Sequence, residues 1–216
     1  MKVINLGKEN SIFNQFIAEI RSVGIQEDSM RFRRNCERLG EILAYEISKT
    51  LNYTPKNIIT PLGELDMQLL KEQPVLATIL RAGLPLHQGL LNYFDKADNA
   101  FVSAYRKHDN DGSFIIEAEY MASPNLEDRI VILSDPMLAS GASIVEIFKL
   151  ILQKGKPKQL HIVVLIASVE GIEYVKKHLP ENTTIWTGAI DEELTAHAYI
   201  VPGLGDAGDL AFGSKE

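Results

Sequence analysis

Apolar residues alternate between short continuous runs and longer stretches with helical spacing. The runs predict strands at residues 57–60, 74–80, 100–105, 114–121, 129–134 and 159–167. Several, such as Ile130-Val131-Ile132-Leu133, are apolar at every position, which is typical of strands buried on both faces. Three- and four-residue spacing predicts helices at 85–94, 141–154 and 170–178. This order predicts an α/β fold with a central, mostly parallel sheet flanked by helices.

Two further segments depart from this alternation. From Asp28-Ser29 we expect a long helix with Ser29 as its N-cap, because apolar residues from Phe32 to Ile47 recur at helical spacing. Residues 105–122 read as a protruding β-hairpin with the polar tip 107–112. No linker or repeat divides the chain, so we expect one domain over 1–216 with an N-terminal arm at 1–30.

The loop from Asp135 to Ser143 carries the strongest chemical signal. An apolar run ends in a carboxylate, small and hydroxyl residues follow, and a helical pattern begins at once. The first N–H groups of a helix lack internal partners and favour an anion, typically phosphate. The charge of Asp135 excludes it as a phosphate ligand, but its oxygens can accept hydrogen bonds from sugar hydroxyls. Phosphate and sugar in one loop suggest a phosphoribosyl group.

Two cationic segments also follow predicted strands. In Leu80-Arg81-Ala82-Gly83 the guanidinium can fork onto diphosphate oxygens, although an exposed arginine capping a strand is the plainer reading of this loop alone. Arg106 and Lys107 open the hairpin, where they could grip the same diphosphate while the hairpin acts as a lid. A solvated hairpin tip is the commoner fate of such sequences.

A glycine- and aspartate-rich segment, Pro202–Gly213, follows the last strand-like run. Its glycines expose backbone groups that can pair with the edge of a planar heterocycle. The carboxylates of Asp206 and Asp209 suit Mg²⁺ held through water. In open α/β sheets ligands bind beyond the carboxyl ends of the strands, so we expect these loops to converge.

Composition narrows the class of protein. A chain of 216 residues, 45% hydrophobic and 24% charged, fits one globular domain, and a net charge of −7 argues against nucleic-acid binding as its main task. The single cysteine, Cys36, permits no internal disulfide. No apolar run resembles a signal peptide or reaches the length of a membrane span, so a cytoplasmic location is expected.

On these loops the chain resembles the uracil phosphoribosyltransferases, a branch of the type I phosphoribosyltransferases. The resemblance covers residues 30–216 and rests on four motifs: Ile79–Leu84, Tyr105-Arg106, Asp135–Ser143 and Tyr199–Gly213. The last motif is characteristic of the uracil branch. The resemblance implies pyrimidine salvage, in which the phosphoribosyl group of 5-phosphoribosyl 1-diphosphate (PRPP) is transferred to uracil, giving UMP and diphosphate.

The resemblance also implies roles for matching residues. PRPP would be bound by Arg81, Arg106, Asp135, Pro136, Met137, Leu138, Ala139, Ser140, Gly141, Ala142, Ser143 and Asp206. Uracil would be bound by Ile200, Gly205, Asp206 and Ala207, within a base-binding tail or hood at 186–216. Catalysis would fall to Asp206, Arg106 and Asp135, with Mg²⁺ as the cofactor and Asp206 as its water-mediated ligand. The loops offer only Asp206 and Asp209 as candidates for a general base.

At three places the sequence departs from the pattern that is usual in this family. Ser140 replaces the usual threonine and keeps the hydroxyl, whereas Ala142 replaces a common glycine and requires a negative φ. The stretch Pro85–Gly89 lacks an acid that the family usually carries. The family further implies GTP as a possible effector and a homodimer or homotetramer, with neither nucleic acid nor membrane as a partner.

Two rival interpretations stay open. One is a regulator that uses the same fold to sense a nucleotide and bind RNA, which would need a basic surface. The other is the same transfer to a different base, a purine or orotate. The acidic balance counts against the first, and the Tyr199–Gly213 motif counts against both.

Overall fold

The computed structural model describes residues 1–108 and 114–214, with the backbone alone described at 104–108 and 114–119. Its helices are α1 (Ile12–Arg21), α2 (Val23–Gln26), α3 (Ser29–Ser48), α4 (Leu84–Tyr93), α5 (Ala142–Gln153), α6 (Val169–His178) and α7 (Ala207–Phe212), with a 3-10 turn η1 (Leu6–Lys8). Its strands are β1 (Lys2–Asn5), β2 (Tyr53–Thr60), β3 (Gly63–Leu70), β4 (Val75–Leu80), β5 (Asp98–His108), β6 (Phe114–Ala122), β7 (Ile130–Ser134), β8 (Met137–Leu138), β9 (Gln159–Val163), β10 (Ile166–Ser168), β11 (Thr184–Thr187), β12 (Ala189–Asp191), β13 (Glu193–Leu194) and β14 (Ile200–Val201).

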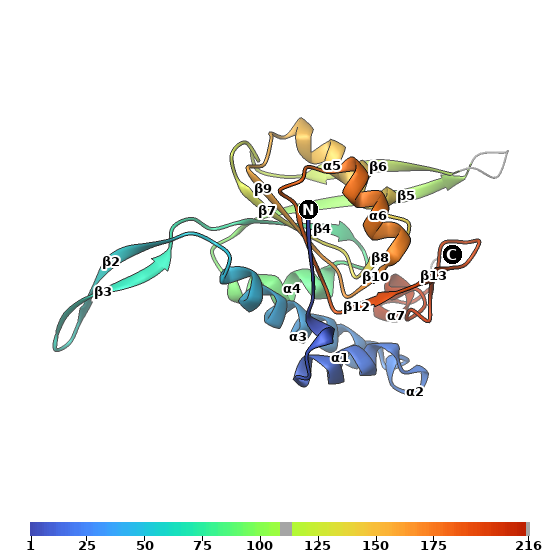
Figure 1. Ribbon diagram of the computed structural model, residues 1–216, viewed down its shortest axis with the longest axis horizontal. Coiled ribbons are helices and arrows are strands. Elements are labelled where there is room, and N and C mark those ends of the chain that lie inside the picture. The colour runs from blue at the N-terminus through green and yellow to red at the C-terminus, as the bar shows by residue number, and fades with distance from the viewer. Residues whose placement is uncertain (109–113, 215–216) are drawn as a thin grey trace.

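The main sheet confirms the α/β prediction. Its strand order is β1-β11-β9-β7-β4-β5-β6, and all neighbours are parallel except the antiparallel pair β5–β6. Helices α5 and α6 cover one face, and α1, α3 and α4 cover the other (Figure 1). Each face has its own buried apolar cluster, which explains why β7 is apolar at every position except Ser134 and is buried throughout.

The structure corrects several element boundaries. The apolar run 159–167 divides into β9 in the main sheet and β10, which pairs with β8 and β12 in a separate three-stranded sheet. The long helix is capped by Asp28, whose carboxylate accepts from the Arg31 N–H at 3.1 Å, and not by Ser29. The predicted hairpin at 105–122 is confirmed in the pairing of β5 with β6, while the tip residues 109–112 lie outside the described residues.

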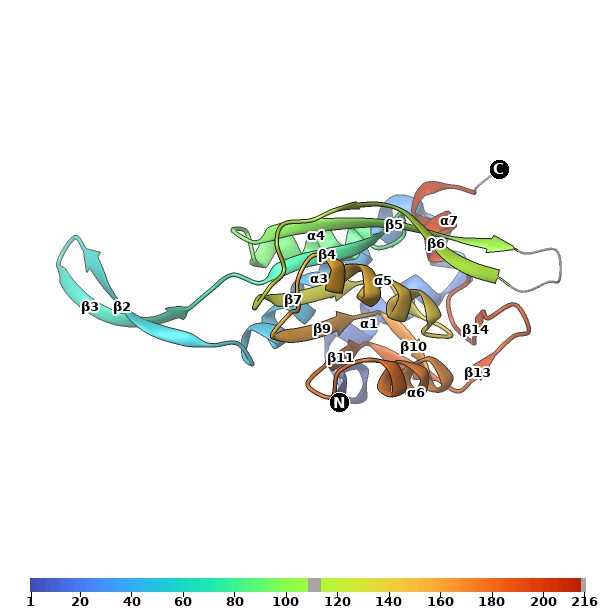
Figure 2. The same cartoon turned by 90° about the horizontal axis from the view of Figure 1, so that it is seen from above.

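A hairpin formed by β2 and β3 extends far from the body of the molecule, at the opposite end from β5 and β6 (Figures 1 and 2). The sequence predicted only residues 57–60 of it as a strand. The register places the apolar side chains of Ile58, Leu65, Met67 and Leu69 on one of its faces. Leu65 and Met67 are 45% and 47% exposed, so this face is largely uncovered within the chain.

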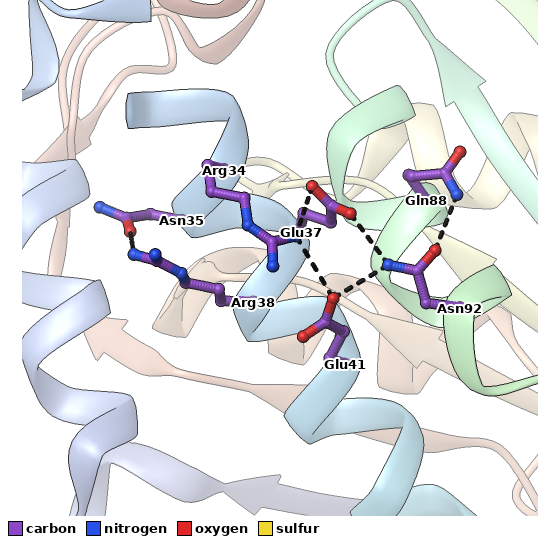
Figure 3. Close-up of polar contacts among 7 residues, drawn as sticks. All are labelled: Arg34, Asn35, Glu37, Arg38, Glu41, Gln88 and Asn92. Atoms are coloured by element: carbon purple, nitrogen blue, oxygen red, sulfur yellow. Dashed lines mark hydrogen bonds and ion pairs between the residues drawn. The ribbon is translucent and has the colours of Figure 1, made fainter. Parts of the chain in front are cut away.

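Close packing of α3 against α4 fixes the start of α4 beneath the sheet. A Cβ atom on Gly89 would lie 2.0 Å from the Glu37 carbonyl oxygen, and one on Gly40 would lie 2.5 Å from the Leu86 carbonyl oxygen. At the rim of this contact the Asn92 amide donates to both Glu37 and Glu41, which also pair with Arg34 (Figure 3). These contacts fix the position of α4, which follows directly on the loop after β4.

Candidate active site

One cavity of about 690 Å³ opens at the carboxyl ends of β4 and β7. Three loops meet there, as predicted: the arginine loop (residues 80–84), the central loop (residues 135–143) and the C-terminal loop. The part of the C-terminal region at the cavity is residues 200–207, which begins just before the predicted segment Pro202–Gly213 and is called the C-terminal loop below. The predicted residues that line it are Arg81, Asp135, Pro136, Met137, Leu138, Ala139, Ser140, Gly141, Ser143, Ile200, Gly205, Asp206 and Ala207. Residues separated by more than a hundred positions thus share one surface.

The central loop ends in a helix terminus suited to an anion. Gly141 has φ +81°, and a Cβ atom there would lie 2.9 Å from the Gly171 carbonyl oxygen, so both conformation and space favour glycine. Helix α5 begins after it without a side-chain cap from Gly141, and the contact of the Ala142 N–H with Ser140 Oγ is long at 3.5 Å, so first-turn N–H groups can turn to a ligand. Ala142 is the first helical residue, which satisfies the requirement for a negative φ.

A support for the central loop comes from a residue that the sequence analysis did not single out. The Ser168 hydroxyl donates to the Ala139 carbonyl at 2.6 Å and accepts from the Gly171 N–H at 2.8 Å while capping α6. A Cβ atom on Gly171 would lie 2.0 Å from the Ala139 carbonyl oxygen. The sequence signal was the serine at a strand end followed by a helical pattern, which indicates only an N-cap.

Asp135 lies half-buried at the end of β7, where its backbone N–H donates to the Val163 carbonyl at 3.0 Å. Burial raises the pKa of its carboxyl to about 7, against the opposing effect of a backbone hydrogen bond from Met137. The carboxyl oxygen lies 3.5 Å from that N–H, so its acceptor capacity is largely unused. Hydroxyl donors from a ligand would supply the missing partners.

The C-terminal loop places backbone groups and one carboxylate at the cavity. Ile200 and Ala207 are buried, and Gly205 has φ +93° with open space where a Cβ would stand. Asp206 caps the short helix α7, its carboxylate accepting from the Asp209 N–H at 3.0 Å. His197 and Tyr199 also line the cavity, although the sequence analysis assigned neither a specific role.

Arg81 joins the arginine loop to the C-terminal segment. Its guanidinium lies 3.4 Å from Asp209 Oδ1 and 3.2 Å from the Gly213 carbonyl oxygen. The Leu80–Arg81 peptide bond is cis. The side chain is 41% exposed, so solvent screens this ion pair and an anionic ligand can compete for the guanidinium.

Of the residues discussed in the sequence analysis, Ala142 and the stretch Pro85–Gly89 do not line this cavity, and the side chain of Arg106 is not described. Ala142 is not among the lining residues, although its neighbours Gly141 and Ser143 are. The backbone of Arg106 pairs with Ile116 in the β5–β6 hairpin, but its side chain lies outside the described part of the chain. The stretch Pro85–Gly89 packs against α3 instead of lining the cavity, and His87 is buried 2.8 Å from Asn99.

The oxygen donors at the cavity fit Mg²⁺ carried by a substrate better than a resident metal. Within the described residues there is no group of three or more histidine, cysteine or acidic side chains able to hold an ion. Asp135 and Asp206 both line the cavity. Mg²⁺ is commonly held by one or two carboxylates, several waters and substrate phosphates, which is the donor set that this cavity can complete.

The parallel sheet, the uncapped start of α5 and the carboxylate of Asp135 at the end of β7 together define a type I phosphoribosyltransferase fold. A hypoxanthine phosphoribosyltransferase from Staphylococcus aureus shares that fold, with a TM-score of 0.52 and 15% identity over 86% of this chain and 83% of that one. The AQ2163 protein from Aquifex aeolicus superposes with a TM-score of 0.87 and 28% identity over 98% of each chain.

A family model described as uracil phosphoribosyltransferase matches residues 8–214, and the chain belongs to that family. The uracil phosphoribosyltransferase of Porphyromonas gingivalis is 54% identical over 215 residues, covering all of both chains. The activity is therefore transfer of a phosphoribosyl group to uracil in pyrimidine salvage, with PRPP as the donor that the family implies. None of the helices in the described residues is long and apolar enough to cross a membrane.

Proposed function

We propose that the three loops divide the substrates between them: the central loop binds the phosphoribosyl group, the arginines bind diphosphate and the C-terminal loop binds uracil. The observation that carries this proposal is the convergence of all three loops on one cavity at the carboxyl edge of the sheet. The finer assignments of residues, metal and assembly follow from it.

The central loop is proposed to hold the 5′-phosphate and the ribose. The donors for the phosphate would be the backbone N–H groups at the start of α5 and the hydroxyls of Ser140 and Ser143, two residues that line the cavity. Asp135 accepts hydrogen bonds from the ribose hydroxyls, which favour its ionised form. Pro136, Met137, Leu138, Ala139 and Gly141 shape the wall of this part of the cavity.

The leaving diphosphate is proposed to lie between Arg81 and Arg106, with Asp206 placing PRPP and water-bound Mg²⁺. As the bond from C1 to the diphosphate oxygen breaks, negative charge grows on diphosphate and positive charge on the ribose ring. The guanidinium of Arg81 stabilises the first charge and the carboxylate of Asp135 the second. Mg²⁺, when bound, neutralises part of the diphosphate charge.

Uracil is proposed to pair with the backbone of Ile200, Gly205 and Ala207, beside Asp206. Fixed backbone groups hold the attacking nitrogen in line with C1, and this positioning supplies much of the acceleration. No covalent enzyme intermediate is required. Specificity for uracil then depends on the conformation of the C-terminal loop.

The test is formation of UMP from uracil, PRPP and Mg²⁺, run beside hypoxanthine, guanine and orotate, with and without GTP. We expect UMP as the main product, and about 100-fold less of it from Arg106→Ala, because a charged contact to the leaving group is lost. Transfer to another base would contradict the assignment of the C-terminal loop. Tight RNA binding that weakens with salt, without UMP formation, would favour a regulator.

Assembly is proposed to be homodimeric through the β2–β3 hairpin. An isolated two-stranded hairpin is marginally stable in water, and a second copy would present the same apolar face in a symmetric contact. We expect the double variant Leu65→Lys, Met67→Lys to be monomeric in light scattering. Asp66→Lys with Gln68→Lys, on the other face of the same strand, should leave the dimer intact. A wild-type monomer would contradict the proposal.

A further inference from the structure

An ion pair behind the cavity holds the C-terminal loop from its outer side. Arg21, the last residue of α1, places one guanidinium nitrogen 2.9 and 2.7 Å from the two carboxylate oxygens of Asp191 at the end of β12. One of those oxygens also accepts from the Gly203 N–H at 2.9 Å. The end of α1, the end of β12 and the C-terminal loop therefore meet at one carboxylate, and α1 is about 170 residues away from the other two in the sequence.

Gly203 is the residue of the C-terminal loop that is hydrogen-bonded to the Arg21–Asp191 pair. It is buried, has φ +55° and follows Pro202, whose peptide bond to Val201 is cis. A Cβ atom at this position would lie 2.1 Å from the carbonyl oxygen of Ile200. The turn is therefore folded tightly onto Ile200, so fixing the Gly203 N–H also fixes the backbone of a residue that lines the cavity.

Two more side chains from the N-terminal helices hold the same segment. The Gln26 amide lies 3.1 Å from the Leu204 carbonyl oxygen and 2.8 Å from that of Ile20, which identifies its nitrogen as the donor to both. Arg33 on α3 donates to the Ala211 carbonyl at 2.7 Å. The backbone on both sides of Gly205 and Asp206 is thus bound from outside the cavity.

The ion pair between Arg21 and Asp191 is expected to contribute more to the placement of the C-terminal loop than to the stability of the fold. Asp191 is 8% exposed, and removing two charges from water costs about as much as their attraction returns. An apolar pair of similar volume could fill the same space, but it could not accept the Gly203 N–H. A charged acceptor makes the stronger hydrogen bond, and Arg21 holds the carboxylate in place through contacts to both oxygens.

We propose that Arg21 and Asp191 are positioning residues for uracil: they set the C-terminal loop so that its backbone meets the base. The inference rests on the proposed uracil role of that loop. It adds the N-terminal helices, which the sequence analysis treated as an arm without a function, to the apparatus that recognises the base. Neither residue touches the cavity itself, since neither is among its lining residues.

The test measures the two Michaelis constants separately in Asp191→Ala, Asp191→Asn, Arg21→Met and Arg21→Lys. We expect Asp191→Ala to raise KM for uracil about tenfold or more while KM for PRPP changes less than about twofold, because a hydrogen bond to a charged acceptor is lost at the base loop only. Asp191→Asn and Arg21→Lys should recover part of the loss. The control is Asp98→Ala, which breaks a surface ion pair with Arg129 of similar length, 2.9 Å.

Amide hydrogen exchange of residues 200–206, measured without substrates, supplies a second readout independent of activity. Faster exchange in Asp191→Ala, together with the selective rise in KM for uracil, would support the proposal. Unchanged exchange, or equal rises in both Michaelis constants, would overturn it. Faster exchange with an unchanged KM for uracil would also overturn it, and would trace the failure to the proposed uracil role of the loop.

Discussion

Asp206→Asn is expected to lower kcat/KM for PRPP by about 100-fold or more while leaving the melting temperature nearly unchanged. Asp206 combines two functions: its carboxylate accepts the Asp209 N–H at 3.0 Å to cap α7, and it lines the cavity where PRPP and Mg²⁺ are proposed to bind. Asparagine caps a helix about as well as aspartate, so this substitution removes only the charge. Losing one charged group that acts in the transition state costs about 10²–10³-fold.

Asp206→Ala separates the two functions further. Both variants should lose activity to a similar extent, but alanine also removes the cap and should lower stability by about 1 kcal/mol, or about 2–4 °C in melting temperature. Glu192→Gln, an exposed acid in the same C-terminal region, is the matched control and should behave as wild type. Steady-state kinetics measure the loss of activity, and calorimetric melting measures the loss of stability. Retained activity in Asp206→Asn would show that the charge is dispensable.

The sequence predicted the parallel core well because burial on both faces leaves an unambiguous pattern. Strands β4 and β7 and helix α5 were found within a residue or two of their observed ends. The same continuous hydrophobicity hid the break at Val164 and Leu165, since both residues are fully buried although the chain leaves one sheet there and enters another. Hydrophobicity reports burial and does not report which neighbour provides it.

The β2–β3 hairpin shows the opposite problem. Most of its side chains are exposed, so few positions carry the alternation that identifies a strand with one buried face. Only the short run at 57–60 was predicted, and the return strand β3, with Glu64, Asp66 and Gln68 among its residues, was not. Such an element is defined by what it contacts, which a single sequence does not reveal.

Residues of the cavity were predictable where the chemical signal lies within one loop. They were not predictable where a residue acts through a contact with a part of the chain far away in the sequence. The central and C-terminal loops were predicted from residue types within each loop: small and hydroxyl residues in the first, glycines and aspartates in the second. The Arg21–Asp191 pair joins positions 170 residues apart, and each looks like an ordinary surface charge in its own segment. Ser168 was likewise visible only as a helix cap, because its hydrogen bond to Ala139 crosses 29 residues.

Asp135→Asn is expected to make the substrate-free protein more stable at pH 8 and nearly inactive. Burial raises the pKa of the Asp135 carboxyl to about 7, against about 3.9 for an unfolded chain. Between those values the folded protein holds a proton that the unfolded chain has released, so ionising this group costs stability that grows as pH rises from about 4 to about 7. Asparagine does not ionise and escapes this cost.

The size and the pH dependence of the gain make the prediction testable. At pH 8 we expect about 1–3 kcal/mol, or roughly 3–10 °C in melting temperature, because the half-buried group is partly screened. The difference should shrink as pH falls from 7 to 4, whereas Asp95→Asn, at an exposed position, should show no such trend. A gain that does not depend on pH would show that packing, and not ionisation, is responsible.

Loss of activity in the same variant follows from the proposed role of the carboxylate. In the ionised form it can accept two ribose hydroxyls and faces the positive charge that grows on the ring, whereas an amide offers one acceptor and no charge. Hydrogen bonds to a charged group contribute about 1.5–3 kcal/mol each, so kcat/KM should fall by about 10²–10⁴-fold. PRPP should therefore stabilise the wild type more than the variant at pH 8 in the same melting experiment, since a ligand at a given concentration stabilises the folded state more the more tightly it binds. Equal stabilisation of the two by PRPP would place the ribose elsewhere in the cavity.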